Sequence, residues 1–366
     1  MPLGPSIAER LNRARADLRM GVPVALVAQA GGGLAVAAEG LDPARFARLA
    51  TLAAPDRPLL LAITARRAET LKARAYDGDL ARIRLPQGAT PAWISAIADP
   101  AHDLMAPMKG PFATERGGQP ELARAAIGLV KSAHLLPAAL VLPLDDPAAF
   151  ARVEGLTLID LDRAAPVLAA ASTFHPVAAA RVPLAASEAG RVHVFRPEDG
   201  GEEHYAIEIG QPPRDRPVLA RLHSACFTGD VLGSLKCDCG AQLKSALARM
   251  GSEGAGVLLY LNQEGRGIGL ANKLRAYSLQ DQGFDTVEAN HRIGFEDDER
   301  DLRIGAALLK ALGFSAVRLM TNNPAKLAML AAQGITVTEH VPLKVGRSRH
   351  NDAYLATKAA KSGHLL

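Results

Sequence analysis

Hydrophobic positions in the first half of the chain alternate between helical and strand-like spacing. Amphipathic periodicity predicts helices at residues 7–20, 43–53, 65–73 and 119–133. Short apolar runs bounded by Gly, Pro and polar residues predict strands at 22–28, 58–63 and 138–142. The Ala-rich stretch 164–180, which contains Pro166 and Pro176, predicts a helix and a connector. Strands and helices that alternate at this spacing indicate a layered α/β domain.

The second half combines strands with helices whose ends are well marked. Apolar runs predict strands at 192–195, 205–209, 218–223, 257–261 and 317–321. Helical periodicity predicts helices at 270–282, 301–312 and 324–333. Gly313 and Gly334 follow two of these helices as C-terminal caps, and Asn322 or Asn323 caps the last helix ahead of Pro324. The predicted class is α/β (α+β), with two layered domains, 1–175 and 176–366, each a mixed β-sheet flanked by helices.

Length and charge limit the classes of protein that fit. A chain of 366 residues with 48% hydrophobic residues is long and apolar enough for two packed domains. Its 42 Lys and Arg against 38 Asp and Glu give a net charge of +4, which favours a phosphorylated small molecule over a nucleic acid. Aromatic residues make up only 4% of the chain, too few for a base-stacking platform. We therefore expect no nucleic-acid partner.

No segment of the sequence suggests a membrane. The N-terminal stretch carries charges every few positions and lacks the apolar core of a signal peptide. Elsewhere, no window reaches the roughly 18 uninterrupted apolar residues of a transmembrane helix. These observations predict a soluble, cytoplasmic protein.

All three cysteines lie in one short segment, as Cys226, Cys237 and Cys239. Their odd number and close spacing exclude a disulfide scaffold and favour reduced thiols. Three thiolates without a fourth Cys are typical of a catalytic zinc, whose open position takes substrate or a water with a pKa of about 7. Two alternatives remain open at this point. One is a structural zinc with His223 as the fourth ligand, and the other is a set of buried thiols without metal.

Three polar loops in the same half have the composition of phosphate sites. Residues 263–269 form a Gly-rich turn with Arg266 between a strand and a helix, but match neither the Walker nor the dinucleotide-binding pattern. Residues 297–301 surround Arg300 with acids at a helix start, and 321–326 place a hydroxyl, amides and a Lys at another. Turn formation or helix capping explains each loop alone equally well. Because these three loops occur in the same half of the chain as the thiols, together they indicate a phosphorylated substrate that binds next to a zinc ion.

Short motifs follow one another through the second half of the chain. They are RLHS at 221–224, CFTGD at 226–230, CDCG at 237–240, QEGR at 263–266, NKLRAY at 272–277, DQG at 281–283, DTVEAN at 285–290, DER at 298–300 and TNNP at 321–324. A C-terminal set belongs with them: Tyr354, Leu355, Lys358, Gly363 and His364. Together these motifs resemble GTP cyclohydrolase II, nearly without gaps from about residue 180 onward.

The resemblance implies a homodimeric zinc hydrolase that acts on a cyclic amidine in the first step of riboflavin biosynthesis. Such an enzyme hydrolyses GTP to 2,5-diamino-6-(5-phosphoribosylamino)pyrimidin-4(3H)-one, formate and pyrophosphate, with Mg²⁺ at the substrate phosphates. By position, Cys226, Cys237 and Cys239 would bind one catalytic Zn²⁺ per chain. The water on that zinc would add at C8 of guanine, and the opened ring would lose formate.

The resemblance also implies roles for individual residues. Arg300 matches the nucleophile toward the α-phosphate, Asp298 the proton acceptor, and Tyr277 a residue at the metal-bound centre. A guanidinium with a pKa above about 12 is a very poor base, so the alternative is that Arg300 stabilises charge on the phosphoryl group. The GTP-contact positions are Arg221, Leu222, His223, Ser224, Ala225, Gln242, Glu264, Gly265, Arg266, Thr321 and Lys326. Among them, Ala225 departs from the pattern, because the family has Glu there.

Residues 15–27, 37–39 and 135–142 more faintly resemble 3,4-dihydroxy-2-butanone 4-phosphate synthase. That synthase needs an acidic run to hold Mg²⁺, whereas residues 28–34 read AQAGGGL and contain no carboxylate. Its Gly-His-Thr-Glu segment appears at 118–121 as Gly-Gln-Pro-Glu, without the His. The resemblance therefore implies a degenerate, non-catalytic domain at 1–175 that supports a dimer or regulates the other half.

Two further functions fit parts of the sequence. Ala225 allows a related zinc cyclohydrolase with altered purine nucleotide selectivity. Loss of turnover would leave a non-catalytic regulator that binds zinc and a nucleotide. The presence of Tyr277, Asp298, Arg300 and all three cysteines argues against that regulator. GTP hydrolysis is the function that the sequence predicts.

Overall fold

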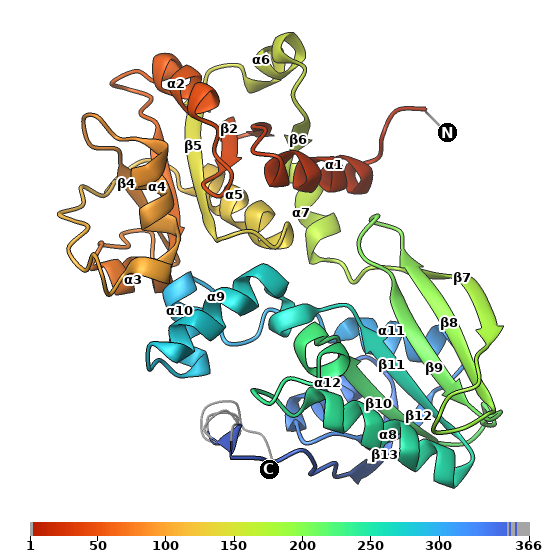
Figure 1. The fold of residues 1–366 in the computed structure, drawn as a ribbon. Coiled ribbons are helices and arrows are strands. Elements are labelled where there is room, and N and C mark those ends of the chain that lie inside the picture. The colour runs from red at the N-terminus through yellow and green to blue at the C-terminus, as the bar shows by residue number, and fades with distance from the viewer. Residues whose placement is uncertain (1–2, 350, 353–355, 357–366) are drawn as a thin grey trace. The chain divides into compact units, whose positions relative to one another are not determined.

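The chain forms two compact units in a computed structural model that describes residues 3–349, 351–352 and 356 (Figure 1). The first unit comprises Met1–Ala170 and Ala271–Glu299, and the second comprises Ala171–Leu270 and Arg300–Leu366. The segment Ala271–Glu299 therefore belongs to the first unit, although it interrupts the second in sequence. The predicted domain limits, 1–175 and 176–366, stay a prediction. The C-terminal set of family residues lies outside the described residues: Tyr354, Leu355, Lys358, Gly363 and His364.

A six-stranded mixed sheet with the order β4–β3–β5–β2–β1–β6 forms the centre of the first unit (Figure 1). Its strands are β1 Val24–Ala28, β2 Gly31–Ala37, β3 Leu60–Thr64, β4 Leu80–Arg84, β5 Ala138–Leu144 and β6 Leu158–Asp160. All neighbouring strands are antiparallel except β1 and β6. The helices are α1 Ile7–Arg19, α2 Pro43–Leu52, α3 Ala65–Leu71, α4 Pro91–Ala98, α5 Glu121–Ser132, α6 Pro147–Glu154, α7 Leu161–Ala169, α9 Leu270–Asp281 and α10 Thr286–Ile293.

Alternate residues of these strands pack against α1, α5 and α7 to form the apolar core of the first unit. Val24 and Leu26 of β1 belong to this core, together with Leu11 and Leu18 of α1 and Val130 of α5. Residues two apart on a strand share one face of the sheet, so the helices cover one continuous apolar surface.

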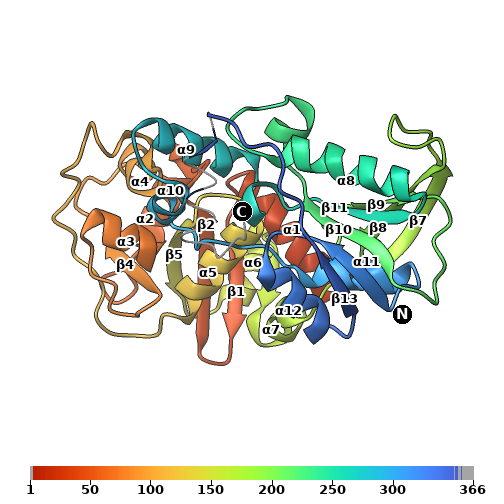
Figure 2. The same cartoon turned by 90° about the horizontal axis from the view of Figure 1, so that it is seen from below.

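A seven-stranded mixed sheet forms the second unit, with the order β13–β12–β10–β11–β9–β8–β7 (Figure 1). Figure 2 shows the same sheet from below. Its strands are β7 Phe174–Arg181, β8 Gly190–Pro197, β9 His204–Ile209, β10 Val218–Ser224, β11 Gly256–Leu261, β12 Ala316–Met320 and β13 Thr336–Val341. Its helices are α8 Cys239–Glu253, α11 Arg303–Ala311 and α12 Pro324–Ala332. The strands β10 to β13 pair in parallel, whereas β7, β8, β9 and β11 pair antiparallel.

The central strand β10 is covered on both faces. Ala220 and Leu222 pack in the apolar cluster that includes α11 and α12. Leu219 packs on the opposite face with Ala246 and Met250 of α8. Parallel strands are usually covered on both faces in this way, and the strand is therefore apolar almost throughout. The alternation also assigns the polar residues at the end of β10 to different faces, which determines what each can contact.

The predicted fold class is confirmed, since both units are mixed sheets flanked by helices. The prediction of a helix and connector at 164–180 is partly wrong. The helix exists as α7, but Phe174–Arg181 forms the edge strand β7, which pairs with β8. Its repeated Ala residues show no alternation of apolar and polar types, so only the pairing with β8 identifies the strand. Among the described residues, no helix has the length and hydropathy required to cross a membrane.

Acid should destabilise the protein through His204, a buried residue at the start of β9. Its Nδ1 accepts a hydrogen bond from the Asn262 amide at 2.9 Å, and burial lowers its pKa from 6.5 to about 4. Between these values the unfolded chain binds a proton that the folded chain does not. Stability should therefore be fully present above pH 6.5 and fall by up to about 3 kcal/mol as the pH drops to about 4.

A His204→Asn variant keeps an acceptor for the Asn262 amide but cannot be protonated, so it should lose this part of the pH dependence. Denaturant unfolding at pH 7 and pH 4.5 measures it. The control is His175→Asn, which removes an exposed imidazole and should keep the parental dependence. Equal pH dependence in the His204→Asn variant and the parent would refute the assignment.

Candidate metal and nucleotide site

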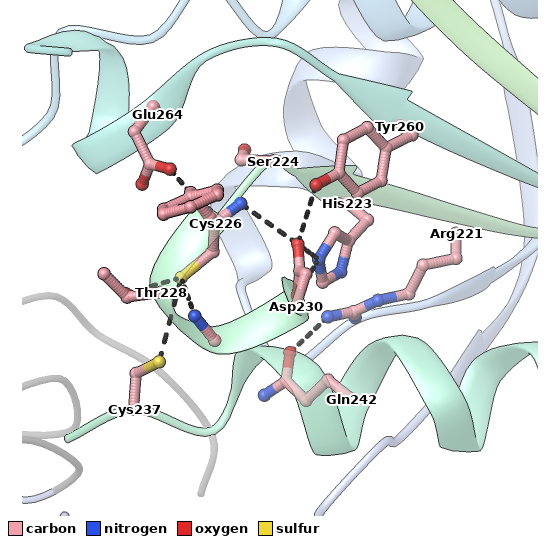
Figure 3. Close-up of polar contacts among 12 residues, drawn as sticks. Arg221, His223, Ser224, Cys226, Thr228, Asp230, Cys237, Gln242, Tyr260 and Glu264 are labelled. Atoms are coloured by element: carbon pink, nitrogen blue, oxygen red, sulfur yellow. Dashed lines mark hydrogen bonds and ion pairs between the residues drawn. The ribbon is translucent and has the colours of Figure 1, made fainter. Parts of the chain in front are cut away.

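The candidate site lies where the parallel strands β10 and β11 end, at Ser224 and Leu261. The carboxyl ends of neighbouring parallel strands meet at one sheet edge, which is the usual binding position in open α/β sheets. Here the edge carries a π-helical turn, Phe227–Val231, the N-terminus of α8, and the loop after β11 (Figure 3). Motif residues from β10, the π-helical turn, α8 and the loop after β11 therefore meet at this edge.

The three cysteines come together from two parts of this edge. Cys226 precedes the π-helical turn, Cys237 lies in the loop after it, and Cys239 is the first residue of α8. Their sulfur atoms all lie within 4.8 Å of one another. Figure 3 shows two of them, the Sγ atoms of Cys226 and Cys237, which are 3.7 Å apart. Cys226 is buried and the other two are partly buried. The sequence spacing thus produces one compact thiol cluster.

The geometry of this cluster fits a tetrahedral zinc ion. Four ligands at the usual Zn–S distance of about 2.3 Å leave sulfur atoms about 3.8 Å apart, close to the distance between Cys226 and Cys237. Hydrogen bonding to Cys226 raises the pKa of Cys237 and Cys239, and burial adds to the shift. Three thiols this close together can all become thiolates only if a bound cation offsets the repulsion between their negative charges. The N-terminus of α8, at Cys239, also favours a negatively charged sulfur.

The absence of a side chain at Gly229 leaves space for the sulfur atoms of the cluster. A Cβ at this position would lie 2.8 Å from Cys237 Sγ and 3.0 Å from Cys226 Sγ. The amide of Gly229 also donates a hydrogen bond to Cys226 Sγ at 3.3 Å, which stabilises negative charge there. The absence of a side chain at Gly229 is therefore part of the metal site.

Asp230 connects the cysteine turn to the two strands. Its carboxylate accepts hydrogen bonds from the Cys226 amide and the Tyr260 hydroxyl, each at 3.0 Å, and contacts His223 Nε2 at the same distance (Figure 3). Burial lowers the pKa of His223, although Asp230 opposes the shift. Because His223 Nε2 faces Asp230 and is absent from the thiol cluster, the described residues supply three ligands and not four. This arrangement favours an open zinc over the structural one.

Arg221 is buried beneath the same edge. It donates to the side chain of Gln242, which in turn donates to Asp238 at 2.5 Å, and its Nη1 donates to the Met320 carbonyl at 3.1 Å. Burial lowers the pKa of Arg221 to about 10. Its Nε is buried without a hydrogen-bond partner in the described structure, which is unusual for a native protein. Two of the predicted GTP-contact residues, Arg221 and Gln242, therefore form one chain of polar contacts.

The loop after β11 contributes a carboxylate and a strained turn. Glu264 accepts a hydrogen bond from the Phe227 amide at 2.6 Å (Figure 3). It also accepts one from the Gly265 amide at 3.0 Å. Gly265 and Arg266 both have a φ of 62°, which is costly for a residue with a side chain such as Arg266. Non-glycine residues held in this region occur preferentially at binding sites. The loop thereby ties the cysteine turn to β11.

Arg300 contacts the opposite face of β10. Its Nη1 donates to Ser224 Oγ at 3.1 Å. On the same face, Lys326 of α12 donates to the Leu222 carbonyl at 2.7 Å, and the hydroxyl of Thr321 accepts from the Asn323 amide at 3.0 Å. Arg300 and Lys326 therefore both contact residues at the carboxyl end of β10.

The remaining predicted residues have simpler surroundings. Leu222 packs in the apolar core, and the Ala225 amide donates to the Leu261 carbonyl at 2.7 Å. Tyr277, on α9, and the exposed Asp298 belong to the first unit, so the site within the second unit contains Arg300 but not these two. The second-unit residues are thus brought to one edge, and Tyr277 and Asp298 lie on the inserted segment.

Sequence reasoning missed three residues of this site. Gly229 and Asp230 stand inside the CFTGD motif, but neither was assigned a role. Tyr260 is the single hydroxyl in the apolar run 257–261, and this was the signal that its side chain points to a polar partner. In the structure its ring stacks on that of His223, with centroids 5.6 Å apart.

Comparison with known proteins determines the family. The model of the family described as GTP cyclohydrolase II matches residues 175–342. A GTP cyclohydrolase-2 of Azospirillum brasilense is 45% identical over 374 residues, which cover 100% of this chain and 96% of that protein. The chain belongs to the GTP cyclohydrolase II family. The resemblance predicted for the second half is therefore confirmed, and with it the class of enzyme, a hydrolase.

Two other similar proteins cover different shares of the chain. A GTP cyclohydrolase-2 of Azotobacter vinelandii is 58% identical over 175 residues, which are 48% of this chain and 84% of that protein. A solved structure of RibBX, a two-domain 3,4-dihydroxy-2-butanone 4-phosphate synthase from A. baumannii, covers 91% of this chain and 99% of its own, with 18% identity and a TM-score of 0.34. This second likeness is too weak to carry an argument, and the role predicted for the first half stays a prediction.

Substitution of Gly229 by Ala should disrupt the thiol cluster of this GTP cyclohydrolase II family member. The added methyl group would force the sulfur atoms apart, so affinity for zinc should fall at least about tenfold while the secondary structure is kept. Competition with a chromogenic chelator measures the affinity.

The matched control is Gly128→Ala in α5, where a Cβ has no neighbour within 4 Å. That variant should bind zinc as the parent does and gain up to about 1 kcal/mol of stability, because Ala favours a helix over Gly. Parental zinc affinity in the Gly229→Ala variant would contradict the geometry.

Proposed function

We propose that this protein hydrolyses GTP to 2,5-diamino-6-(5-phosphoribosylamino)pyrimidin-4(3H)-one, formate and pyrophosphate, in the first step of riboflavin biosynthesis. The observation that carries the proposal is the cluster of three cysteines without a fourth described ligand, at the carboxyl ends of β10 and β11 and within the range that the family model matches. Zinc bound by three thiolates supplies Lewis acidity and a water with a pKa of about 7. Its ligands would be Cys226, Cys237 and Cys239.

The cations beside β10 suit the triphosphate of the substrate. Arg300 is held by Ser224 at the end of the strand, and Lys326 reaches the neighbouring Leu222 carbonyl. Both can exchange these contacts for phosphate oxygens, and Arg266 adds a further guanidinium from the strained loop. We assign Arg300 to the α-phosphate. A guanidinium hardly ever loses its proton, so it is a poor nucleophile. Stabilising the charge on the phosphoryl group is therefore a simpler role for Arg300 than nucleophilic attack on the α-phosphate.

Polar residues around the cysteines would position the nucleoside. Arg221 and Gln242 hold each other through a hydrogen bond, and Glu264 is fixed by two backbone amides. Groups that are fixed before substrate binds lose little entropy on binding. Tyr277 and Asp298 would act from the inserted segment, Asp298 as the proton acceptor and Tyr277 at the metal-bound centre. The magnesium ion at the phosphates, the homodimer and the cytoplasmic location stay predictions.

The experiment that tests the function is GTP turnover by metal-quantified protein, followed through formate and pyrophosphate together. We expect about one zinc per chain, equal amounts of both products, and loss of both with a chelator. Zinc-loaded protein that forms neither product from GTP would overturn the proposal. In that case Ala225 points to the alternative, a cyclohydrolase with altered purine nucleotide selectivity, which assays with other purine triphosphates would detect.

Cys237→Ser and Arg300→Ala should separate metal binding from turnover. A neutral hydroxyl is a weak zinc ligand, so Cys237→Ser should lose zinc and activity together. Arg300→Ala should keep zinc and lose at least about a hundredfold in turnover, because it removes charge stabilisation from the transition state. Zinc analysis and product assays on the same samples measure both effects.

The control for the arginine is Arg249→Ala, which removes a surface partner of Glu253 on α8 and should change neither zinc content nor turnover. Loss of zinc from the Arg300→Ala variant would show that Arg300 has been misplaced.

A further inference from the structure

The inserted segment Ala271–Glu299 is held in the first unit by buried and half-buried polar contacts. At its start, Arg275 of α9 donates to Glu39 at 2.8 Å and to Asp99 at 3.1 Å. Its Nη1 also donates to Asn272, whose own amide donates to the His134 carbonyl at 3.1 Å. Two carboxylates of the N-terminal part thus share one guanidinium of the segment, a charge-assisted arrangement with a defined geometry.

The turn after α10 is fitted even more closely. Thr64, at the end of β3, donates its hydroxyl to the Gly294 carbonyl at 2.8 Å in a buried position. A Cβ on Gly294 would lie 2.8 Å from both this hydroxyl and a ring carbon of Pro137, and the φ of Gly294 is +105°. Only glycine accepts this conformation and this proximity without strain. The backbone of the segment is therefore fitted against β3 and the residue before β5.

Arg67 anchors this contact from within. Its side chain is 1% exposed and donates to the Arg292 carbonyl at 3.2 Å and to the Ile97 carbonyl at 2.8 Å. Asp103 completes the arrangement by accepting from both Arg67 and Lys109. A buried guanidinium paired in this way is costly to disturb, because removal of one partner leaves the other uncompensated.

Two ion pairs flank Asp298 at the end of the segment. Arg66 of α3 binds both carboxylate oxygens of Glu296, with a shortest distance of 2.8 Å. Lys131 of α5 lies 2.6 Å from Glu299. The residues on either side of Asp298 are thus each tied to the N-terminal part.

We propose that the N-terminal part of the first unit is a positioning scaffold for Ala271–Glu299, in which Glu39 and Thr64 act as positioning residues for Tyr277 and Asp298. This inference rests on the proposed function, because those two residues carry catalytic roles only there. The physical basis is entropic. A long insertion that is not docked samples many positions, and reacting groups must be held to within about 1 Å to act efficiently.

The scaffold gives a role in the reaction to the N-terminal part, which the sequence predicts to be non-catalytic. The A. vinelandii relative is covered over 84% of its length by 48% of this chain, so most of that protein has its counterpart in about half of this chain. We therefore assign to this chain the dependence of the inserted segment on the N-terminal part. Four residues of that part contact the segment: Glu39, Asp99, Thr64 and Arg67. Exposed contacts contribute too little to hold the segment in place. The contacts of Thr64 and Arg67 with the segment are buried, so they can hold it.

The test uses full-length zinc-loaded protein with two matched pairs of variants. Thr64→Val removes the hydroxyl that binds Gly294 and that also caps α3 by accepting from the Arg67 amide. Its control Thr90→Val removes only a capping hydroxyl, the one at the start of α4. Glu39→Gln removes a charge from Arg275, and its control Asp79→Asn removes one from the Arg124 pair. GTP turnover, the KM for GTP, zinc content and hydrogen exchange of peptides within 271–293 are measured for each.

Thr64→Val and Glu39→Gln should lower kcat about tenfold, with KM and zinc content within about twofold of the parent, and should speed exchange of the segment. Thr64→Ser should restore both, and the controls should match the parent. Unchanged exchange and kcat in both variants would overturn the scaffold, as would equal losses in the controls. If the parent itself fails to hydrolyse GTP, the proposed function fails, and the exchange of the segment still decides whether Glu39 and Thr64 hold it.

Discussion

The sulfur atoms of Cys226, Cys237 and Cys239 lie within 4.8 Å of one another, and the rest of the site is arranged around this constraint. The π-helical turn carries Cys226, and the start of α8 carries Cys239. These two segments can meet only because both lack side chains where they touch. A Cβ on Gly240 would lie 2.2 Å from the Gly229 carbonyl oxygen, and one on Gly229 would strike the sulfur atoms. Asp230 then fixes the turn to the strands through Tyr260 and the Cys226 amide.

The elements that the sequence predicted well are those whose pattern and end signals agree. The helix predicted at 324–333 is α12, and Asn323, one of two candidates, caps it by accepting from the Ala325 amide. The strand predicted at 257–261 is β11 within one residue, because it is buried and therefore apolar on both faces. Local pattern and tertiary burial point to the same structure in these cases.

The elements that it missed depend on contacts far away in sequence. The strand β2 begins with three glycines, and its Gly33 has no room for a side chain beside the Leu142 carbonyl of β5. Glycine runs look like loops, so only the pairing reveals the strand. The residues of the site also divide into those with a local sequence signal and those whose role depends on contacts between distant segments. The spacing of the cysteines indicated a metal, whereas the role of Asp230 depends on strands β10 and β11 lying side by side. The packing of Ala271–Glu299 on the first unit had no sequence signal at all.

The central claim is that the cysteines hold a zinc ion with one open position. Zinc-edge X-ray absorption of the loaded protein, with and without GTP, measures the ligand set directly. The account predicts three sulfur ligands at about 2.3 Å and one oxygen or nitrogen ligand. Four protein ligands, with a spectrum that GTP does not change, would contradict it.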